Sequence, residues 1–375
     1  MGLALRLIGH KKIRTAVGVS GIAFAILFMF LQLGFSGALT ATAVAVSSHL
    51  EGELVLVSSR FLHIAETGSI PRSRLFQAQA RPEVFSVTPL YMRFARWKAP
   101  ETGRRCSMFT IGFPLSGEAP LSLPGLREAL PALKAPGTLA ADSESQDKCG
   151  VNAALAAVEV RERRMEAVGR YSMGIGFLGD GSMVVSDETY AQIFEGQSLD
   201  AVDMAAVRLR PGSDVETAAA RLRQILPPDT RVLTRRELDD LQSRYWVEDT
   251  AIGSIFALGA VVGFLVGTMI LYQVLSTDIR SQLPQYATMK AMGFPNKNIY
   301  LLVLQQSWLF AALGYVPALL LAVLVYEAAY DATRIPIAMN ASRAILVLVL
   351  SLMMCTVSGL LSLRRIGHAD PAELF

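Results

Sequence analysis

One long stretch near the start of the chain carries no charged side chain. Between Thr15 and Leu50 there is no Asp, Glu, Lys or Arg, and residues 16–35 are almost continuously apolar. Three further apolar runs follow much later, at 251–277, 300–326 and 344–363. Each is long enough for the roughly 20 helical residues that cross about 30 Å of hydrocarbon. The sequence therefore predicts four transmembrane helices with a large soluble region between the first and the second.

Composition supports this division. The chain is 52% hydrophobic and only 18% charged, with a mean hydropathy of +0.39, whereas soluble domains carry about 25% charged residues. These values exclude intrinsic disorder. The net charge of +3 is too small to indicate a nucleic-acid partner.

Basic residues near the ends of the apolar runs predict the orientation, because short loops rich in Lys and Arg stay in the cytoplasm. They precede the first run, lie between the second and third, and follow the fourth: Arg6, Lys11, Lys12, Arg14, Arg280, Lys290, Lys297, Arg364 and Arg365. Both termini are thus expected in the cytoplasm and the large domain outside. A cleaved signal peptide is the alternative for the first run, which is far longer than the usual 7 to 15 apolar residues of such a signal.

The predicted organisation follows the chain in nine segments. In order, they are a cytoplasmic segment 1–15, transmembrane helix 1 with a periplasmic stalk 16–50, a periplasmic α/β domain 51–245, transmembrane helix 2 at 246–277, a cytoplasmic coupling loop 278–299, helix 3 at 300–327, a short periplasmic loop 328–342, helix 4 at 343–363 and a cytoplasmic tail 364–375. The expected fold class is an α-helical membrane protein with four transmembrane helices plus a large mixed α/β periplasmic domain between helices 1 and 2.

Local signals in the second half of the large domain predict alternating strands and helices. Strands are expected at 183–186, 204–209 and 231–233, and helices at 187–194 and after two capping boxes. The boxes are Ser213 to Glu216 and Thr234 to Glu237. Residues 100–136 hold many prolines, which predicts an irregular, loop-rich insertion.

The three cysteines suggest one structural bond. Cys106 and Cys149 lie on the expected oxidising side of the membrane, so a disulfide is our hypothesis, with two buried thiols as the alternative. Such a bond would stabilise the fold by about 3 to 4 kcal/mol. Cys355 lies in an apolar run and is interpreted as a packing residue.

Basic residues are frequent in one part of the large domain. They could bind an anionic lipid headgroup or a partner protein. The alternative is an ordinary solvated surface with scattered charge. The residues are Arg60, Arg72, Arg74, Arg81, Arg93, Arg96, Lys98, Arg104 and Arg105.

Several chemistries have no motif in this sequence. It has no Gly-x-x-x-x-Gly-Lys-Ser/Thr to cradle ATP, no paired metal-ligand spacing and no credible catalytic constellation, so no catalytic or metal site is expected. The apolar runs lack charged residues in their central portions, which argues against ion-coupled transport. Gly259, Gly263 and Gly267 form a small-xxx-small stripe, typical of a homodimer or helix-packing seam.

The loop between the second and third runs contains a short predicted helix. Pro284 suits its first turn and Gly293 its C-terminal stop. Such a helix along the membrane surface would receive force from a cytoplasmic partner; the alternative is an interfacial loop anchored by Tyr286 and Phe294.

The sequence resembles the FtsX/MacB-type ABC transporter permeases, and among them the DevC-like subgroup. The resemblance rests on Tyr272 to Ile279, on Leu283-Pro-Gln-Tyr-Ala-Thr-Met-Lys-Ala-Met-Gly293, on Val185 to Asp187, Val232 to Thr234, Arg72 to Gln77 and Ala369 to Glu373. It implies a homodimeric permease of the bacterial inner membrane, not itself an enzyme. Residues 283–298 would dock on the ATPase, through Pro284, Tyr286, Thr288, Lys290, Met292, Gly293 and Phe294.

The same resemblance implies the partners. Two copies of a separate ABC ATPase would bind ATP and Mg, while this chain binds no cofactor directly. A periplasmic membrane-fusion adaptor, a TolC-like outer-membrane protein and membrane lipid complete the expected set, with export of an amphiphile by mechanotransmission. The alternative function is an FtsX-like transducer that activates a periplasmic enzyme without transport.

Overall fold

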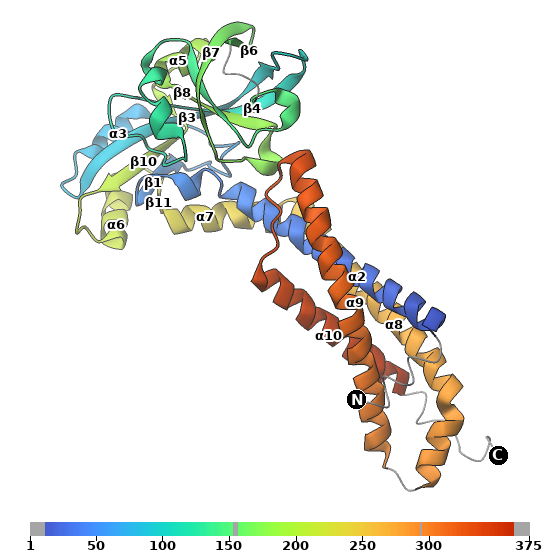
Figure 1. Cartoon of the computed structure of the whole chain (residues 1–375). Coiled ribbons are helices and arrows are strands. Elements are labelled where there is room, and N and C mark those ends of the chain that lie inside the picture. The colour runs from blue at the N-terminus through green and yellow to red at the C-terminus, as the bar shows by residue number, and fades with distance from the viewer. Residues whose placement is uncertain (1–11, 153–156, 293–294, 364–375) are drawn as a thin grey trace. The chain divides into compact units, whose positions relative to one another are not determined.

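The computed structural model describes residues 12–152, 157–292 and 295–363, which form two compact units (Figure 1). The α/β unit comprises residues 37–253 and 329–336. The helical unit comprises the described parts of 1–36, 254–328 and 337–375. Four helices are long and apolar enough to cross a membrane, and the α/β domain lies in sequence between the first and the second. The predicted fold class is confirmed.

The four long helices extend differently from the predicted spans. They are α2 (Lys12–Ala43), α8 (Ala251–Ala291), α9 (Asn296–Thr333) and α10 (Ala341–Leu363). The α-helix of α2 ends at Ala43, before a turn and a 3-10 helix at Ser47–His49, so the predicted helical stalk to Leu50 is too long. Helices α8 and α9 continue past their apolar residues, because hydropathy marks where a helix crosses lipid and helix-forming polar residues extend it further.

Eleven strands are described in the α/β unit. They are β1 (Leu54–Ser58), β2 (Ile70–Pro71), β3 (Val84–Lys98), β4 (Arg105–Phe113), β5 (Thr138–Asp142), β6 (Ala157–Val160), β7 (Arg163–Tyr171), β8 (Gly181–Ser186), β9 (Ala201–Val202), β10 (Met204–Leu209) and β11 (Thr230–Thr234). Nine of them form one sheet in the order β11-β1-β10-β3-β4-β8-β5-β7-β6, and β2 pairs with β9. An additional pairing of β6 with β3 closes the last six strands into a ring.

Strand β3 is long enough to belong to both parts of this sheet. Its first half, to Leu90, pairs with β10, whereas residues from Tyr91 onward pair with β4. Because side chains alternate along a strand, one face of all six ring strands points to a common interior. Trp97, Met108, Leu139, Val158 and Met183 share that buried cluster.

Short helices cover the sheet in the α/β unit. They are α3 (Arg72–Gln79), α4 (Leu126–Ala129), α5 (Asp187–Ile193), α6 (Val215–Ile225) and α7 (Arg235–Arg244), with 3-10 turns at Ala132–Lys134, Asp147–Cys149 and Gly176–Leu178 and a π-helix at Tyr245–Asp249. The capping box at Thr234 and Glu237 is present. The capping box predicted from Ser213 to Glu216 is wrong, because Asp214 is the N-cap and accepts from the Thr217 N–H, which leaves Glu216 outside the third helical position that a box requires.

The prediction of an irregular insertion over 100–136 is wrong for residues 105–113. Residues 105–113 form β4, which pairs with β3 on one side and β8 on the other. Pro100 and Pro114 flank this strand, and no proline lies within it. Counting the prolines of residues 100–136 together therefore predicted a loop, whereas their positions at both ends of residues 105–113 are compatible with a strand between them.

Candidate coupling sites

The last residues of α9 belong to the α/β unit. The Tyr330 hydroxyl donates to the Glu144 carboxylate, and Arg334 forms an ion pair with Asp147, with 3.1 Å between nitrogen and oxygen. The Arg334 guanidinium also lies over the Tyr330 ring, 5.6 Å from its centre. Arg334 adopts a left-handed conformation (φ 55°), and its N–H closes the helix on the Tyr330 carbonyl at 2.7 Å. We call residues 329–336 the attachment segment.

The loop that receives the attachment segment is held by a buried carboxylate. Asp142, at the end of β5, accepts hydrogen bonds from the Ser182 hydroxyl and from the backbone N–H groups of Glu144, Met173 and Gly174, at 2.8–3.1 Å. Burial raises the pKa of Asp142, although these donors oppose the rise. Because several donors converge on one buried acceptor, the loop after β5 is fixed to the loop after β7.

The 3-10 helix Ser47–His49, which follows α2, makes a second connection within the α/β unit. The Ser47 hydroxyl donates to Asp239 of α7, and Arg235 donates to the Ser48 carbonyl at 2.9 Å. Gln242 of α7 is fully buried beside Ser47. Helix α7 therefore anchors the chain where it leaves α2.

The chain enters α8 through a sharp break. Thr250 is extended, and its hydroxyl donates to the Trp246 carbonyl at 2.6 Å and accepts from the Gly253 N–H at 3.3 Å. A Cβ on Gly253 would lie 2.2 Å from the Val247 carbonyl oxygen, so only glycine fits this approach. His63 stacks against Tyr245 with ring centres 4.9 Å apart, and partial burial lowers the pKa of His63.

The predicted coupling residues lie at the other end of α8. The backbone is helical through Pro284, Tyr286, Thr288 and Lys290, so the separate short helix is instead the continuation of α8. One proline removes a single helical hydrogen bond, and good helix formers surround it here. Met292 follows with 64% of its surface exposed. Gly293 and Phe294 lie outside the described residues.

The glycine stripe of α8 packs inside this chain. A Cβ on Gly259 would lie 2.4 Å from Cδ of Gln32, one on Gly263 3.0 Å from Phe28, and one on Gly267 2.3 Å from the sulfur of Met354. These contacts bring α8 against α2 and α10. The helix-packing part of the interpretation thus has a geometric basis within one chain, and dimerisation through the stripe stays a prediction.

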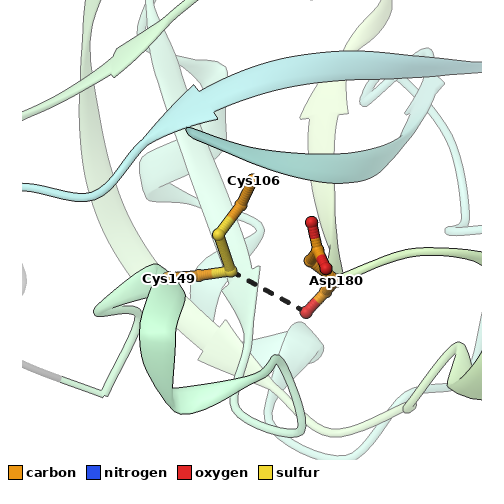
Figure 2. A group of neighbouring side chains, drawn as sticks. All are labelled: Cys106, Cys149 and Asp180. Atoms are coloured by element: carbon orange, nitrogen blue, oxygen red, sulfur yellow. Dashed lines mark hydrogen bonds between the residues drawn. A yellow bond between two sulfur atoms is a disulfide. The ribbon is translucent and has the colours of Figure 1, made fainter. Parts of the chain in front are cut away.

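The two cysteines of the α/β unit are joined in a disulfide, with 2.08 Å between the sulfur atoms (Figure 2). It links β4 to the 3-10 turn at Asp147–Cys149, and the Trp97 indole N–H donates to the Cys149 carbonyl at 2.9 Å. Asp180 lies beside the bond, with its carboxylate accepting from the Ser107 N–H and paired with Lys148. Both sulfurs are consumed by the bond, so this cluster offers no thiolate to a metal.

The sequence signals found some of these residues and missed others. The capping box on α7 and the cysteines were identifiable locally. Glu144, Asp147, Tyr330 and Arg334 were not, because the partners are nearly 190 residues apart and no spacing rule links them. The sequence shows only that Tyr330 and Arg334 follow the apolar run at 300–326, and this position does not indicate their partners.

Comparison with known protein families finds one match, in the last part of the chain. Residues 257–371 match the family model of the FtsX-like permease C-terminal domain. No curated protein matches the sequence.

Two solved structures are similar to parts of this one. The periplasmic region of MacB from Actinobacillus actinomycetemcomitans is 10% identical, with a TM-score of 0.38, over 52% of this chain and 93% of that one. The extracellular domain of the noncanonic ABC-type transporter YknZ from Gram-positive bacteria is 12% identical, with a TM-score of 0.34, over 44% of this chain and 90% of that one. Residues 257–371, which contain most of α8 and all of the described α9 and α10, are therefore similar to the C-terminal domain of FtsX-like permeases.

Proposed function

We propose that the chain is the permease subunit of an ATP-driven export complex that works by mechanotransmission and belongs to the DevC-like subgroup. It moves an amphiphilic or lipid-like substrate from the periplasm or outer leaflet through a membrane-fusion adaptor and a TolC-like duct. Two copies of a separate ATPase bind ATP and Mg, and a second copy of this chain completes the permease. The complex lies in the bacterial inner membrane with the termini in the cytoplasm and the α/β unit in the periplasm.

Helix α9 is the observation that carries the proposal. It starts at Asn296, within the predicted ATPase-docking segment 283–298, and continues as one helix to Thr333, with Pro317 in its interior. Its 38 residues span roughly 57 Å at 1.5 Å per residue. Tyr330 near its end and Arg334 just after it are bonded to Glu144 and Asp147, so a single helix connects the Asn296 end with the attachment segment of the α/β unit.

The end of α8 supports docking at the same place. Met292 is largely exposed although it is apolar, and its N–H is bonded to the Thr288 carbonyl at 3.0 Å. Flexible, polarisable methionine side chains suit an adaptable protein interface. The ATPase is expected to cover this position.

Charged substitution tests the docking. Tyr286→Glu combined with Met292→Glu should abolish co-purification of the ATPase, or leave ATP hydrolysis that no longer drives export. Phe76→Glu is the control, because Phe76 of α3 is 66% exposed but lies in the α/β unit. It should leave ATPase binding unchanged.

Export at the wild-type rate by the double variant would contradict the docking assignment. Transport is tested separately, by lipid release from proteoliposomes that hold the complex and its adaptor. Coupled ATP hydrolysis without release of any lipid would instead favour a transducer that activates a periplasmic enzyme.

A further inference from the structure

The structure gathers part of the basic sequence region around one hollow of the α/β unit. The hollow measures about 770 Å³ and lies where β3 meets β4 and the turn between β6 and β7. Its charged lining consists of five cationic side chains, Arg93, Arg96, Lys98, Arg105 and Arg161, and of Glu159 and Glu162. Arg74, a basic residue of the region outside the hollow, forms an ion pair with Asp229.

The positive charges of this hollow are poorly neutralised by the protein. Lys98 pairs with Glu159 at 2.7 Å. Among the described residues, Arg96 and Arg105 form no ion pair. Moreover, Lys98 and Arg105 occupy directly opposed positions of β3 and β4. Like charges at such positions destabilise a sheet, so this arrangement disfavours the empty hollow.

The turn between β6 and β7 adds a residue at a conformational cost. Arg161 and Glu162 both have positive φ, 47° and 66°, in a two-residue hairpin loop that usually takes Asn or Gly. The Arg161 N–H donates to the Arg96 carbonyl at 2.8 Å, which fixes the turn beside β3. The Arg161 guanidinium lies 5.1 Å from the centre of the buried Phe194 ring. Stacking by its face leaves the N–H edges of the guanidinium available for a ligand.

We propose that this hollow binds the phosphate group of a small ligand, with Arg96, Arg105 and Arg161 as its principal donors. Guanidinium groups match phosphate oxygens in paired hydrogen bonds, and charge-assisted bonds of this kind are the stronger ones. The volume lies within the range of small-molecule sites, about 300 to 1,000 Å³. A phosphate supplies negative charge beside Arg105, which lies opposite Lys98 and has no ion pair among the described residues. Binding requires neither an ATPase nor export.

Calorimetric titration of the full chain in phosphatidylcholine nanodiscs tests the site. Glycerol 1-phosphate and soluble dihexanoyl phosphatidic acid are the probes, and dihexanoyl phosphatidylcholine is the comparison. We expect saturable binding that weakens with added salt. Tight binding of both phosphate probes indicates a soluble phosphate ester, and binding of phosphatidic acid alone indicates a lipid headgroup.

Substitution of Arg105 separates binding from folding. Arg105→Gln should weaken binding about tenfold or more, while the unliganded protein unfolds at the same or a higher temperature because the repulsion with Lys98 is gone. Arg96→Gln should weaken binding to a similar degree, and it replaces Arg105→Gln as the test if that variant does not fold. The control is Arg104→Gln, since Arg104 is exposed but does not line the hollow. Absence of saturable binding to wild type, or equal affinity in the Arg96, Arg104 and Arg105 variants, would overturn the proposal.

Discussion

The two units differ in where they keep their large apolar side chains. Among the described residues of the α/β unit most are buried, and the exposed ones are Leu62, Phe76, Phe85, Ile225 and Ile252. The helical unit exposes many along every long helix, for example Phe24, Ile255, Leu265, Met269, Leu320 and Ile345. The first pattern suits water and the second suits lipid tails, so each unit is folded for a different solvent.

The two units also differ in the interactions that hold each of them together. The α/β unit has a disulfide, a closed ring of strands and a buried carboxylate with several donors. The helical unit relies on close backbone approach at glycines and on a few bonds between helices, such as the Ser358 hydroxyl with the Thr268 carbonyl at 2.8 Å. Between lipid-exposed helices there is little hydrophobic driving force, so fit between surfaces replaces it.

The largest expected effect comes from removing the covalent link of the α/β unit. Cys106→Ala with Cys149→Ala should lower its free energy of unfolding by about 4 kcal/mol, because the unfolded chain regains the freedom of the closed loop. Denaturant unfolding of the full chain, followed by fluorescence of the buried Trp97, measures this. A reductant should affect wild type and Cys355→Ala alike, and should not affect the double variant. Equal stability of oxidised and reduced wild type would contradict the prediction.

A bulky side chain in the glycine stripe tests the helical unit. Gly267→Leu should destabilise it by about 3 kcal/mol, because the new atoms collide with the Cβ of Ala25, only 2.9 Å from an added Cβ. Thermal unfolding in nanodiscs provides the measurement. Ala257→Leu is the matched control, since Ala257 of the same helix is exposed. If both variants unfold alike, close packing along the stripe is not what holds α8.

Acidity should affect the α/β unit through Asp203. Burial raises the pKa of this carboxyl from 3.8 to about 6, although it accepts from the Met92 N–H at 2.7 Å. The folded state therefore binds the proton more tightly, so this contribution to stability is complete below pH 3.8 and is lost as the pH rises through about 6. The loss amounts to about 3 kcal/mol. Asp203→Asn should flatten the unfolding free energy over that range.

Asp229 provides the control of opposite sign. The hydrogen bond from Arg74 lowers its pKa, so its contribution is present at neutral pH and lost as the pH falls below the ordinary range of a carboxyl. Asp229→Asn should change only the acidic end of the curve. A pH profile of Asp203→Asn identical to that of wild type would refute the assignment.

The smallest effect on stability is expected at the attachment segment. Tyr330→Phe removes the bond to Glu144 but keeps the ring beneath Arg334, so the unfolding free energy should change by less than about 1 kcal/mol. Amide hydrogen exchange of residues 329–336 should nevertheless accelerate up to about fivefold. Tyr300→Phe, near the opposite end of α9, should leave that exchange unchanged. An unaltered rate in both variants would mean that the bond does not hold the segment.

The features that the sequence could predict depend on residues close together along the chain. Charge-free runs located the four long helices, and strand β10 has the predicted limits because alternation and the Pro211-Gly212 turn define it. Thr234 and Glu237 identified the start of α7 since both halves of a capping box lie within one turn. At α6 both Ser213 and Asp214 are good N-caps, and the choice between them depends on the Thr217 N–H, which sequence alone does not place.

Contacts between residues far apart in the sequence were not predicted, and the reason is the same for each. The closure of β6 on β3 rests on two residue pairs more than 60 positions apart, and the attachment segment contacts residues from before β6. In the hollow, the opposition of Lys98 and Arg105 follows from strand register, which a count of basic residues does not contain. Only the folded chain brings such groups together.

The attachment segment has a consequence for how this protein can be divided. A fragment cut at residues 37 and 253 would contain every described strand, yet it would leave Glu144 and Asp147 facing water instead of Tyr330 and Arg334. The compact α/β unit is discontinuous in sequence. A fragment meant to keep the contacts of Glu144 and Asp147 must therefore include residues 329–336 as well as 37–253.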